Sequence, residues 1–176
     1  MAFVDPDPQA FRDPLTELTL IMLTITRQLA FDAGHRIPDH QSRCRNLHGH
    51  RYVLEITLQG SVIKTQGAPD CGMVMDFSEV KTLAMRHLVE AWDHAFLVYQ
   101  DDARVRAFLE TMPEHKTVII NRIPTAENLA AIAFERLAGV YDAHYGVNLR
   151  LAKVRLYETP HCWADVVRDG YTAEDR

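Results

Sequence analysis

The sequence predicts an α+β domain built on a four-stranded antiparallel sheet, with two main helices on one face of the sheet. Residues 21–31 and 52–59 alternate apolar and polar side chains, the period-2 pattern of half-buried strands. Two apolar patterns of helical spacing follow, at about 77–92 and 126–141. Two further strand-like stretches, the last over 162–167, complete the order ββααββ. This order favours a single sheet with both helices on the same side.

The first two strands are joined by residues 38–47 and are most simply an antiparallel hairpin. His35 lies just past the end of the first strand, across from His48 and His50 at the start of the second. His48 and His50 are two residues apart, so on a strand they point the same way. Gly49 between them leaves no side chain on the opposite face. The hairpin is therefore expected to bring three imidazoles together.

Three converging imidazoles form a ligand set for zinc, and three protein ligands leave one position open, as in catalytic sites. An HGH tripeptide alone is a weak signal, which the position of His35 strengthens. Cys44, in the connecting loop, leaves two interpretations open. It could be a fourth ligand that closes a structural site. Alternatively, its neighbours Arg43 and Arg45 could favour a reactive thiolate.

The helices carry recognisable start and end signals. Asp76 can cap the first helix, with Glu79 three residues further on. This helix ends at Asp93-His94, which is either an ordinary polar helix end or a pair that faces a common pocket. Thr125 is expected to cap the second main helix.

Between the two helices, segment 96–122 carries no chemical role that its sequence reveals. It is predicted to contain a short extra helix and a short strand, around Val105, Phe108 and Leu109 and around Val118 and Ile120, respectively. Near the end of the third predicted strand, Glu158 places a carboxylate on an apolar face. Such a group needs partners that donate hydrogen bonds, and a salt bridge to an arginine would be one solution.

Composition narrows the class of protein. The 176 residues, 47% of them hydrophobic, predict one domain over 17–170, with an N-terminal arm (1–16) and a C-terminal tail (171–176). A net charge of -5 argues against nucleic acid, and the apolar run Leu129–Phe134 is too short for a membrane span. Three cysteines without a CxxC motif and an N-terminus without a targeting pattern predict a cytoplasmic protein.

Two motifs, FxAxH at 31–35 and CxxxHGH at 44–50, resemble those of the pterin synthase family that contains 6-pyruvoyl-tetrahydropterin synthase and 6-carboxytetrahydropterin synthase. The resemblance covers about residues 20–168. In that family three histidines hold Zn²⁺ and the cysteine is catalytic. The resemblance therefore implies the metal ligands His35, His48 and His50 and the catalytic residue Cys44.

Four further residues match the family in order. Asp93 and His94 match its acid/base dyad, Glu158 matches the glutamate that grips the aminopyrimidinone edge of the pterin, and Thr125 matches a threonine that contacts the pterin. Cys44 lies four residues before His48, the spacing of the 6-carboxy branch.

The resemblance also implies an assembly and a reaction. The family has the tunnelling fold, whose sheets join between subunits into a barrel, commonly in homohexamers with active sites between subunits. The 6-carboxy branch converts 7,8-dihydroneopterin triphosphate to 6-carboxy-5,6,7,8-tetrahydropterin, with release of acetaldehyde and triphosphate, in queuosine biosynthesis. Two alternatives stay open: a 6-pyruvoyl-type triphosphate lyase, and a non-catalytic zinc-stabilised assembly module.

Overall fold

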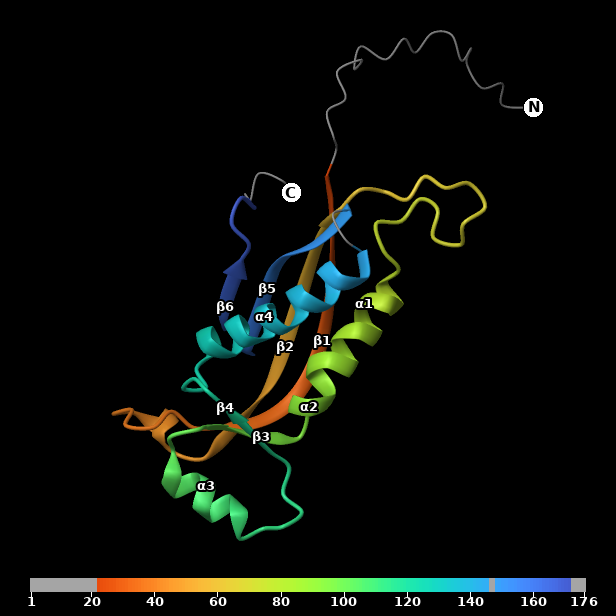
Figure 1. Ribbon diagram of the computed structural model, residues 1–176. Coiled ribbons are helices and arrows are strands. Elements are labelled where there is room, and N and C mark those ends of the chain that lie inside the picture. Colours follow the sequence, from red (N-terminus) through yellow and green to blue (C-terminus); the bar gives the residue numbers. More distant parts are fainter. Residues whose placement is uncertain (1–21, 146–147, 172–176) are drawn as a thin grey trace, which may run out of the picture.

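The computed structural model describes residues 22–145 and 148–171, which fold around one curled, mixed sheet (Figure 1). The strands are β1 (Leu23–His35), β2 (His48–Gly60), β3 (Ala95–Tyr99), β4 (Thr117–Ile120), β5 (Leu149–Thr159) and β6 (Cys162–Val167). The helices are α1 (Phe77–Ala84), a π-helical turn (Met85–Val89), α2 (Glu90–Trp92), α3 (Ala103–Glu110) and α4 (Ala126–Tyr145). The predicted N-terminal arm, and the predicted tail beyond Tyr171, lie outside the described residues.

The prediction of four strands is wrong, because the sheet of the described residues has six, in the order β4-β3-β1-β2-β5-β6. The four expected strands lie side by side and are antiparallel. Strand β3 then extends the sheet along the far side of β1, and β4 extends it along β3, both in parallel pairing. The strand around Val118 was predicted, whereas β3 (AFLVY) is a short apolar run without the period-2 pattern that identified the other strands.

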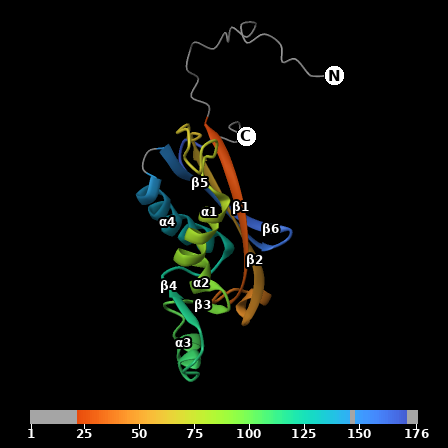
Figure 2. The ribbon, with the colours of Figure 1, turned by 90° about the vertical axis from the view of Figure 1, so that its right-hand side faces the viewer.

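Both main helices cover the same face of the sheet, as predicted (Figure 2). The first runs without a break from α1 through the π-helical turn into α2, and the Asp76 side chain caps it by accepting a hydrogen bond from the Ser78 amide at 2.6 Å. Thr125 caps α4 in the same way, with its Oγ1 3.3 Å from the Asn128 amide. The α4 helix continues past the predicted end to Tyr145. No helix in the described ranges combines the length and apolar character that a membrane crossing requires.

The hydrophobic core lies between this face of the sheet and the two helices. Alternate residues of β2 point into it, and Tyr52, Leu54, Ile56 and Leu58 are all fully buried. Burial of each such side chain contributes about 1.5 to 3 kcal/mol. The two preceding positions of the same alternation are His50 and His48, so the apolar face of β2 becomes polar at the end of the hairpin.

Replacement of two glycines by alanine should change the stability of the protein in opposite directions. A Cβ at Gly49 would lie 2.9 Å from the carbonyl oxygen of Ala33 on β1, a contact that only a shift of the paired strands can relieve. Gly139 lies in α4 with nothing within 4 Å of its Cβ position. We expect Gly49→Ala to lower the free energy of unfolding by about 1 to 3 kcal/mol. Gly139→Ala should raise it by about 0.5 to 1 kcal/mol.

Urea unfolding of both variants beside the parent measures the two changes. The strand contact would be refuted by a Gly49→Ala variant as stable as the parent.

Candidate metal centre and active site

The structure brings His35, His48 and His50 together at the end of the β1–β2 hairpin, as the sequence predicted. The register pairs His35 with His48 and Ala33 with His50, which places the three imidazoles on one face of the sheet. One nitrogen from each ring lies within 4.8 Å of the others. The ring centroids of His35 and His48 are 4.5 Å apart, and that of His50 is 5.2 Å and 5.0 Å from them. This group could hold a metal ion.

In the rings of His35 and His48, a hydrogen bond to a backbone carbonyl determines which nitrogen is free. His35 Nδ1 donates to the Pro124 carbonyl at 2.7 Å, and His48 Nδ1 donates to the Asn46 carbonyl at 2.8 Å. The Nε2 atom of each ring therefore keeps its lone pair, the arrangement that metal-binding histidines use.

The environment of His35 provides a test of whether a metal fits. Its side chain is 0% exposed, and its Nε2 is a buried atom with no hydrogen-bond partner among the described residues. Burial lowers the pKa of His35 to about 4 and lowers the pKa of His50 as well. Neutral imidazoles with a buried, unpaired acceptor are costly unless something binds that acceptor. Together with the nearby ring nitrogens of His48 and His50, this buried nitrogen suits Zn²⁺.

Glu158 faces the same centre. Its Oε1 lies 3.6 Å from His35 Nε2 and 3.9 Å from His50 Nε2, on the apolar face of β5 where the sequence placed it. In the described part of the chain, these imidazoles, and not an arginine, lie within ion-pair distance of the carboxylate. The arginine salt bridge considered from the sequence is therefore not the arrangement found.

Tyr52 is a further neighbour of this centre, which the sequence predicts only as a strand residue. Its ring centroid lies 6.0 Å from that of His35 and 5.7 Å from that of His50. Its hydroxyl is buried without a hydrogen-bond partner in the described residues, and burial raises its pKa, with smaller contributions from Glu158 and Cys44. The period-2 pattern held the signal, since Tyr52 follows His50 by two residues.

Cys44 lies in a 3₁₀ turn formed by Arg43–Arg45, which we call the thiol turn. Three backbone hydrogen bonds hold it: the Ile37 amide donates to the Cys44 carbonyl at 2.8 Å, the Asn46 amide to the Arg43 carbonyl at 3.0 Å, and the Arg45 amide to the Ser42 carbonyl at 3.3 Å. Across the described residues, the metal-holding group at this end of the hairpin contains the three histidines without Cys44. This geometry favours an open site over one that Cys44 closes.

Asp93 and His94 form a bonded pair although they are adjacent in sequence. Asp93 ends α2 in an extended conformation and His94 has a φ of 57°, so the chain turns sharply between the helix and β3. His94 Nδ1 then lies 3.0 Å from Asp93 Oδ2. The Asp32 amide donates to Asp93 Oδ1 at 3.0 Å, and this hydrogen bond is the main reason that the pKa of Asp93 is lowered.

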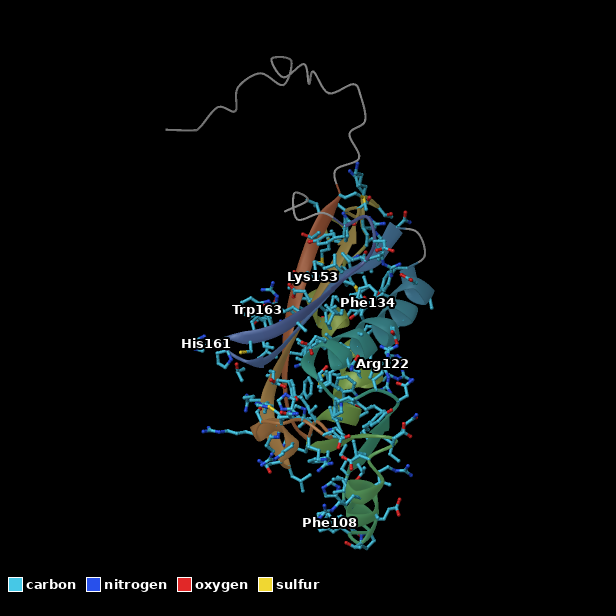
Figure 3. All side chains as sticks on the ribbon, turned by 90° about the vertical axis from the view of Figure 1, so that its left-hand side faces the viewer. Phe108, Arg122, Phe134, Lys153, His161 and Trp163 are labelled. Atoms are coloured by element: carbon cyan, nitrogen blue, oxygen red, sulfur yellow. The ribbon has the colours of Figure 1, made fainter. Side chains whose placement is uncertain are left out.

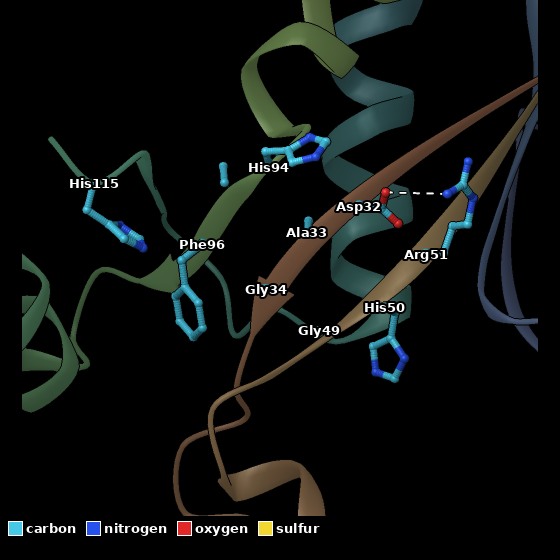
Figure 4. A pocket seen from close by; sticks show the side chains of 10 residues that line it. Asp32, Ala33, Gly34, Gly49, His50, Arg51, His94, Phe96 and His115 are labelled. Atoms are coloured by element: carbon cyan, nitrogen blue, oxygen red, sulfur yellow. Dashed lines mark hydrogen bonds and ion pairs between the residues drawn. The ribbon is translucent and has the colours of Figure 1, made fainter.

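Two clefts meet at His50. The first, of about 530 Å³, has His94, Phe96 and His115 on the β3 side of β1, and His50 and Arg51 on β2 (Figure 4). This cleft therefore joins one member of the Asp-His pair, His94, to one member of the histidine cluster, His50. The second cleft, of about 550 Å³, is lined by His50 and by a set from β2, β5 and the turn after it, including Val53, Tyr157, Glu158 and Pro160.

Thr125 lies at the start of α4, next to the residue that holds His35. It directly follows Pro124, whose carbonyl holds His35, and its hydroxyl caps α4. The capping role expected from the sequence is therefore confirmed. Its contact with a pterin stays a prediction.

A mixed sheet backed by two helices, with a histidine cluster at a hairpin end and an Asp-His pair whose His94 shares a cleft with His50, defines an α+β protein with a candidate metal site of an enzyme-like kind. Sequence and structure comparisons then give the family. The model of the 6-pyruvoyl tetrahydropterin synthase family matches residues 24–169, and the chain belongs to this family.

Several relatives support this assignment. A Rickettsia felis protein named 6-carboxy-5,6,7,8-tetrahydropterin synthase is 38% identical over 145 residues, 82% of this chain and 100% of the relative. A Haemophilus influenzae protein of the same name is 32% identical over 79% of this chain and 94% of its own. The structure of Caenorhabditis elegans 6-pyruvoyl tetrahydropterin synthase superimposes with a TM-score of 0.56 and 26% identity, covering 84% of this chain and 96% of that one.

The histidine cluster generates a prediction about metal content. We expect the purified protein to carry about one zinc ion per chain, and His48→Ala to lose most of it, because two imidazoles rarely suffice. Cys44→Ala should keep its zinc. Elemental analysis measures all three, and His40→Ala is a matched control because His40 is exposed in the same connection. Full zinc in His48→Ala would move the site elsewhere, and zinc loss in Cys44→Ala would indicate a closed site.

Proposed function

We propose that this protein is a zinc-dependent 6-carboxytetrahydropterin synthase, a lyase that converts 7,8-dihydroneopterin triphosphate to 6-carboxy-5,6,7,8-tetrahydropterin with release of acetaldehyde and triphosphate. The observation that carries the proposal is the group formed by His35, His48 and His50, with Glu158 Oε1 3.6 Å from His35 Nε2 and 3.9 Å from His50 Nε2. Membership of the family and the names of the Rickettsia and Haemophilus relatives support the choice of reaction. We place this reaction in queuosine biosynthesis as part of the proposal.

His35, His48 and His50 would hold the zinc ion. When bound there, zinc supplies a Lewis acid that stabilises negative charge on substrate oxygen atoms. The protein's own contribution is to orient the imidazoles. The Pro124 and Asn46 carbonyls do this by accepting the Nδ1 protons of His35 and His48.

Cys44, Asp93 and His94 are assigned the proton transfers. Cys44, as a thiolate, takes a proton from a substrate carbon, and His94 gives or takes the second proton. The Asp93 carboxylate is fixed by the Asp32 amide, so it can hold His94 by its Nδ1 proton and leave Nε2 facing outward for catalysis. The roles follow the logic of a base oriented by a carboxylate.

Glu158 is proposed to bind the pterin ring. It lines the second cleft together with Val53, Tyr157 and Pro160, so a flat ring would meet apolar walls and a carboxylate. The carboxylate can accept hydrogen bonds from two N–H groups of the aminopyrimidinone edge. These would be charge-assisted hydrogen bonds in a partly buried site. Thr125, beside the Pro124 carbonyl, is proposed as a further contact to the pterin.

The proposal includes a homohexamer with active sites between subunits. Its support is that both outer strands of the sheet carry exposed apolar side chains, Ile119 on β4 and Trp163 and Val167 on β6. Figure 3 shows Trp163 and His161 projecting from the β5–β6 hairpin. Unpaired strand edges of this kind invite pairing with another chain. We also propose a cytoplasmic location, which fits the free thiols of Cys44, Cys71 and Cys162.

A 6-pyruvoyl-type triphosphate lyase is the second candidate, because the family model and the C. elegans structure carry that name. Both reactions use the same kind of site and differ in whether the carbon side chain is cleaved. Incubation with 7,8-dihydroneopterin triphosphate followed by mass analysis separates them. We expect 6-carboxy-5,6,7,8-tetrahydropterin and acetaldehyde from the parent and neither from Cys44→Ala. A product that retains the three-carbon side chain would replace the proposal with this second candidate.

Substitution of Glu158 should lower the affinity for a pterin, whereas substitution of His94 should lower the turnover. Glu158→Gln keeps the size but turns a donor toward the pterin's own donors, which removes a pair worth about 1.5 to 3 kcal/mol. Its affinity for a non-reacting pterin should fall by roughly tenfold or more. His94→Ala should bind that pterin almost normally, and its turnover should fall by about a hundredfold or more. Titration with the pterin and steady-state rates test both roles. Parental affinity in Glu158→Gln would refute the role of Glu158, and parental turnover in His94→Ala would refute that of His94.

A further inference from the structure

Asp102 is the one buried carboxylate in the part of the chain that the structure describes, with only 6% of its surface exposed. It begins α3, where its Oδ1 accepts a hydrogen bond from the Val105 amide at 3.3 Å. A helix cap needs one carboxylate oxygen and no burial. The burial of a charge is costly without a specific partner, so Asp102 requires an explanation beyond the cap.

The partner is Arg36, the residue that directly follows His35. Arg36 Nε lies 2.6 Å from Asp102 Oδ2, and its Nη2 lies 3.4 Å from Oδ1, so the guanidinium engages both oxygens. The remaining nitrogen, Nη1, donates to the carbonyl of Arg45 at 3.4 Å. One guanidinium therefore joins the end of β1, the start of α3 and the thiol turn. Only the planar fork of an arginine can make these contacts together.

The thiol turn passes this connection on to the candidate metal site. The Ile37 amide, next to Arg36, donates to the Cys44 carbonyl, and the carbonyl of Asn46, just after the turn, holds His48 Nδ1. The continuous path of contacts thus runs from Asp102 through Arg36 to the turn that carries Cys44, and on to His48.

The α3 helix has few other ties to the main body. It packs on β3 through a small separate cluster, formed by Val98, Val105 and Leu109 with Phe96 against them. The main core does not include these residues. In Figure 1 the helix lies below β3 and β4, at the end of the molecule that holds the hairpin connection. The Arg36–Asp102 pair is its polar link to the thiol turn.

We propose that Arg36 and Asp102 are positioning residues, and that through them the segment containing β3, α3 and β4 fixes the thiol turn so that Cys44 is held in place for proton transfer. This gives segment 96–122 the role that its sequence does not reveal. The catalytic part of the inference rests on the proposed function of Cys44. The structural part, that the pair holds the turn, does not.

Asp102→Asn tests the structural part. Asparagine caps helices as well as aspartate does, so α3 should stay formed while the charge on the pair is lost. We expect hydrogen exchange at the Ile37 and Asn46 amides, which donate into the turn, to accelerate by roughly tenfold, with zinc content unchanged. Asp101→Asn is the matched control, because it removes a neighbouring exposed charge that lies outside this path. Parental exchange rates in Asp102→Asn would overturn the proposal.

Arg36→Lys is a second variant that does not depend on the cap. A lysine keeps the charge but cannot reach Asp102 and the Arg45 carbonyl together, so exchange at the same amides should again accelerate. Arg36→Gln combined with Asp102→Asn should be no worse than Arg36→Gln alone, because the pair acts as one unit. Independent, additive effects would overturn the proposal.

Steady-state kinetics test the catalytic part. If the turn positions Cys44, Asp102→Asn should lower kcat by roughly tenfold while KM and the affinity for a non-reacting pterin change little. A merely less stable protein would lose active fraction without faster exchange confined to the turn. Faster exchange with parental kcat would overturn the role of the turn in catalysis. A parent that makes no pterin product, with the exchange effect still present, would reject the proposed function alone.

Discussion

The pairing of β1 with β2 is the constraint on which the site depends. The register sets His35 opposite His48 and Ala33 opposite His50, and the same register turns the apolar residues of both strands toward the helices. A slip by one residue would move every side chain of one strand to the other face and would separate the imidazoles. The core therefore stabilises the site indirectly: the free energy gained by burying β2 side chains holds the register, and the register holds the histidines.

The same face changes character along its length, which explains how a stable core can end in reactive groups. Tyr52 is fully buried and stacks at 5.3 Å on Phe31, whereas His50, two residues earlier, borders two clefts. The side chain of His35 is fully buried, and this burial lowers its pKa. Within the described residues, neither His35 Nε2 nor the Tyr52 hydroxyl has a hydrogen-bond partner, a local cost that binding of a ligand at His35 would partly offset.

Local patterns predicted most of this from the sequence, and long-range geometry accounts for what they missed. The hairpin, the Asp76 and Thr125 caps and the short helix α3 follow from periodicity and capping chemistry. Strand β3 was missed because its pairing with β1 depends on a turn at His94, whose positive φ no pattern signals. The Arg36–Asp102 pair spans 66 positions, and no spacing rule relates residues so far apart.

The two halves of the candidate site differ in exposure, and one physical requirement accounts for the difference. The His35 side chain is 0% exposed, as a metal ligand should be, whereas the His94 side chain is 76% exposed. A proton-transfer group in bulk water competes with water as donor and acceptor, so the role proposed for His94 requires a cover. Strands β4 and β6 lie at the two edges of the sheet of the described residues, and both carry exposed apolar side chains. A second subunit apposed through such an edge would supply that cover, so the open edges and the exposed dyad have a common explanation in the proposed assembly.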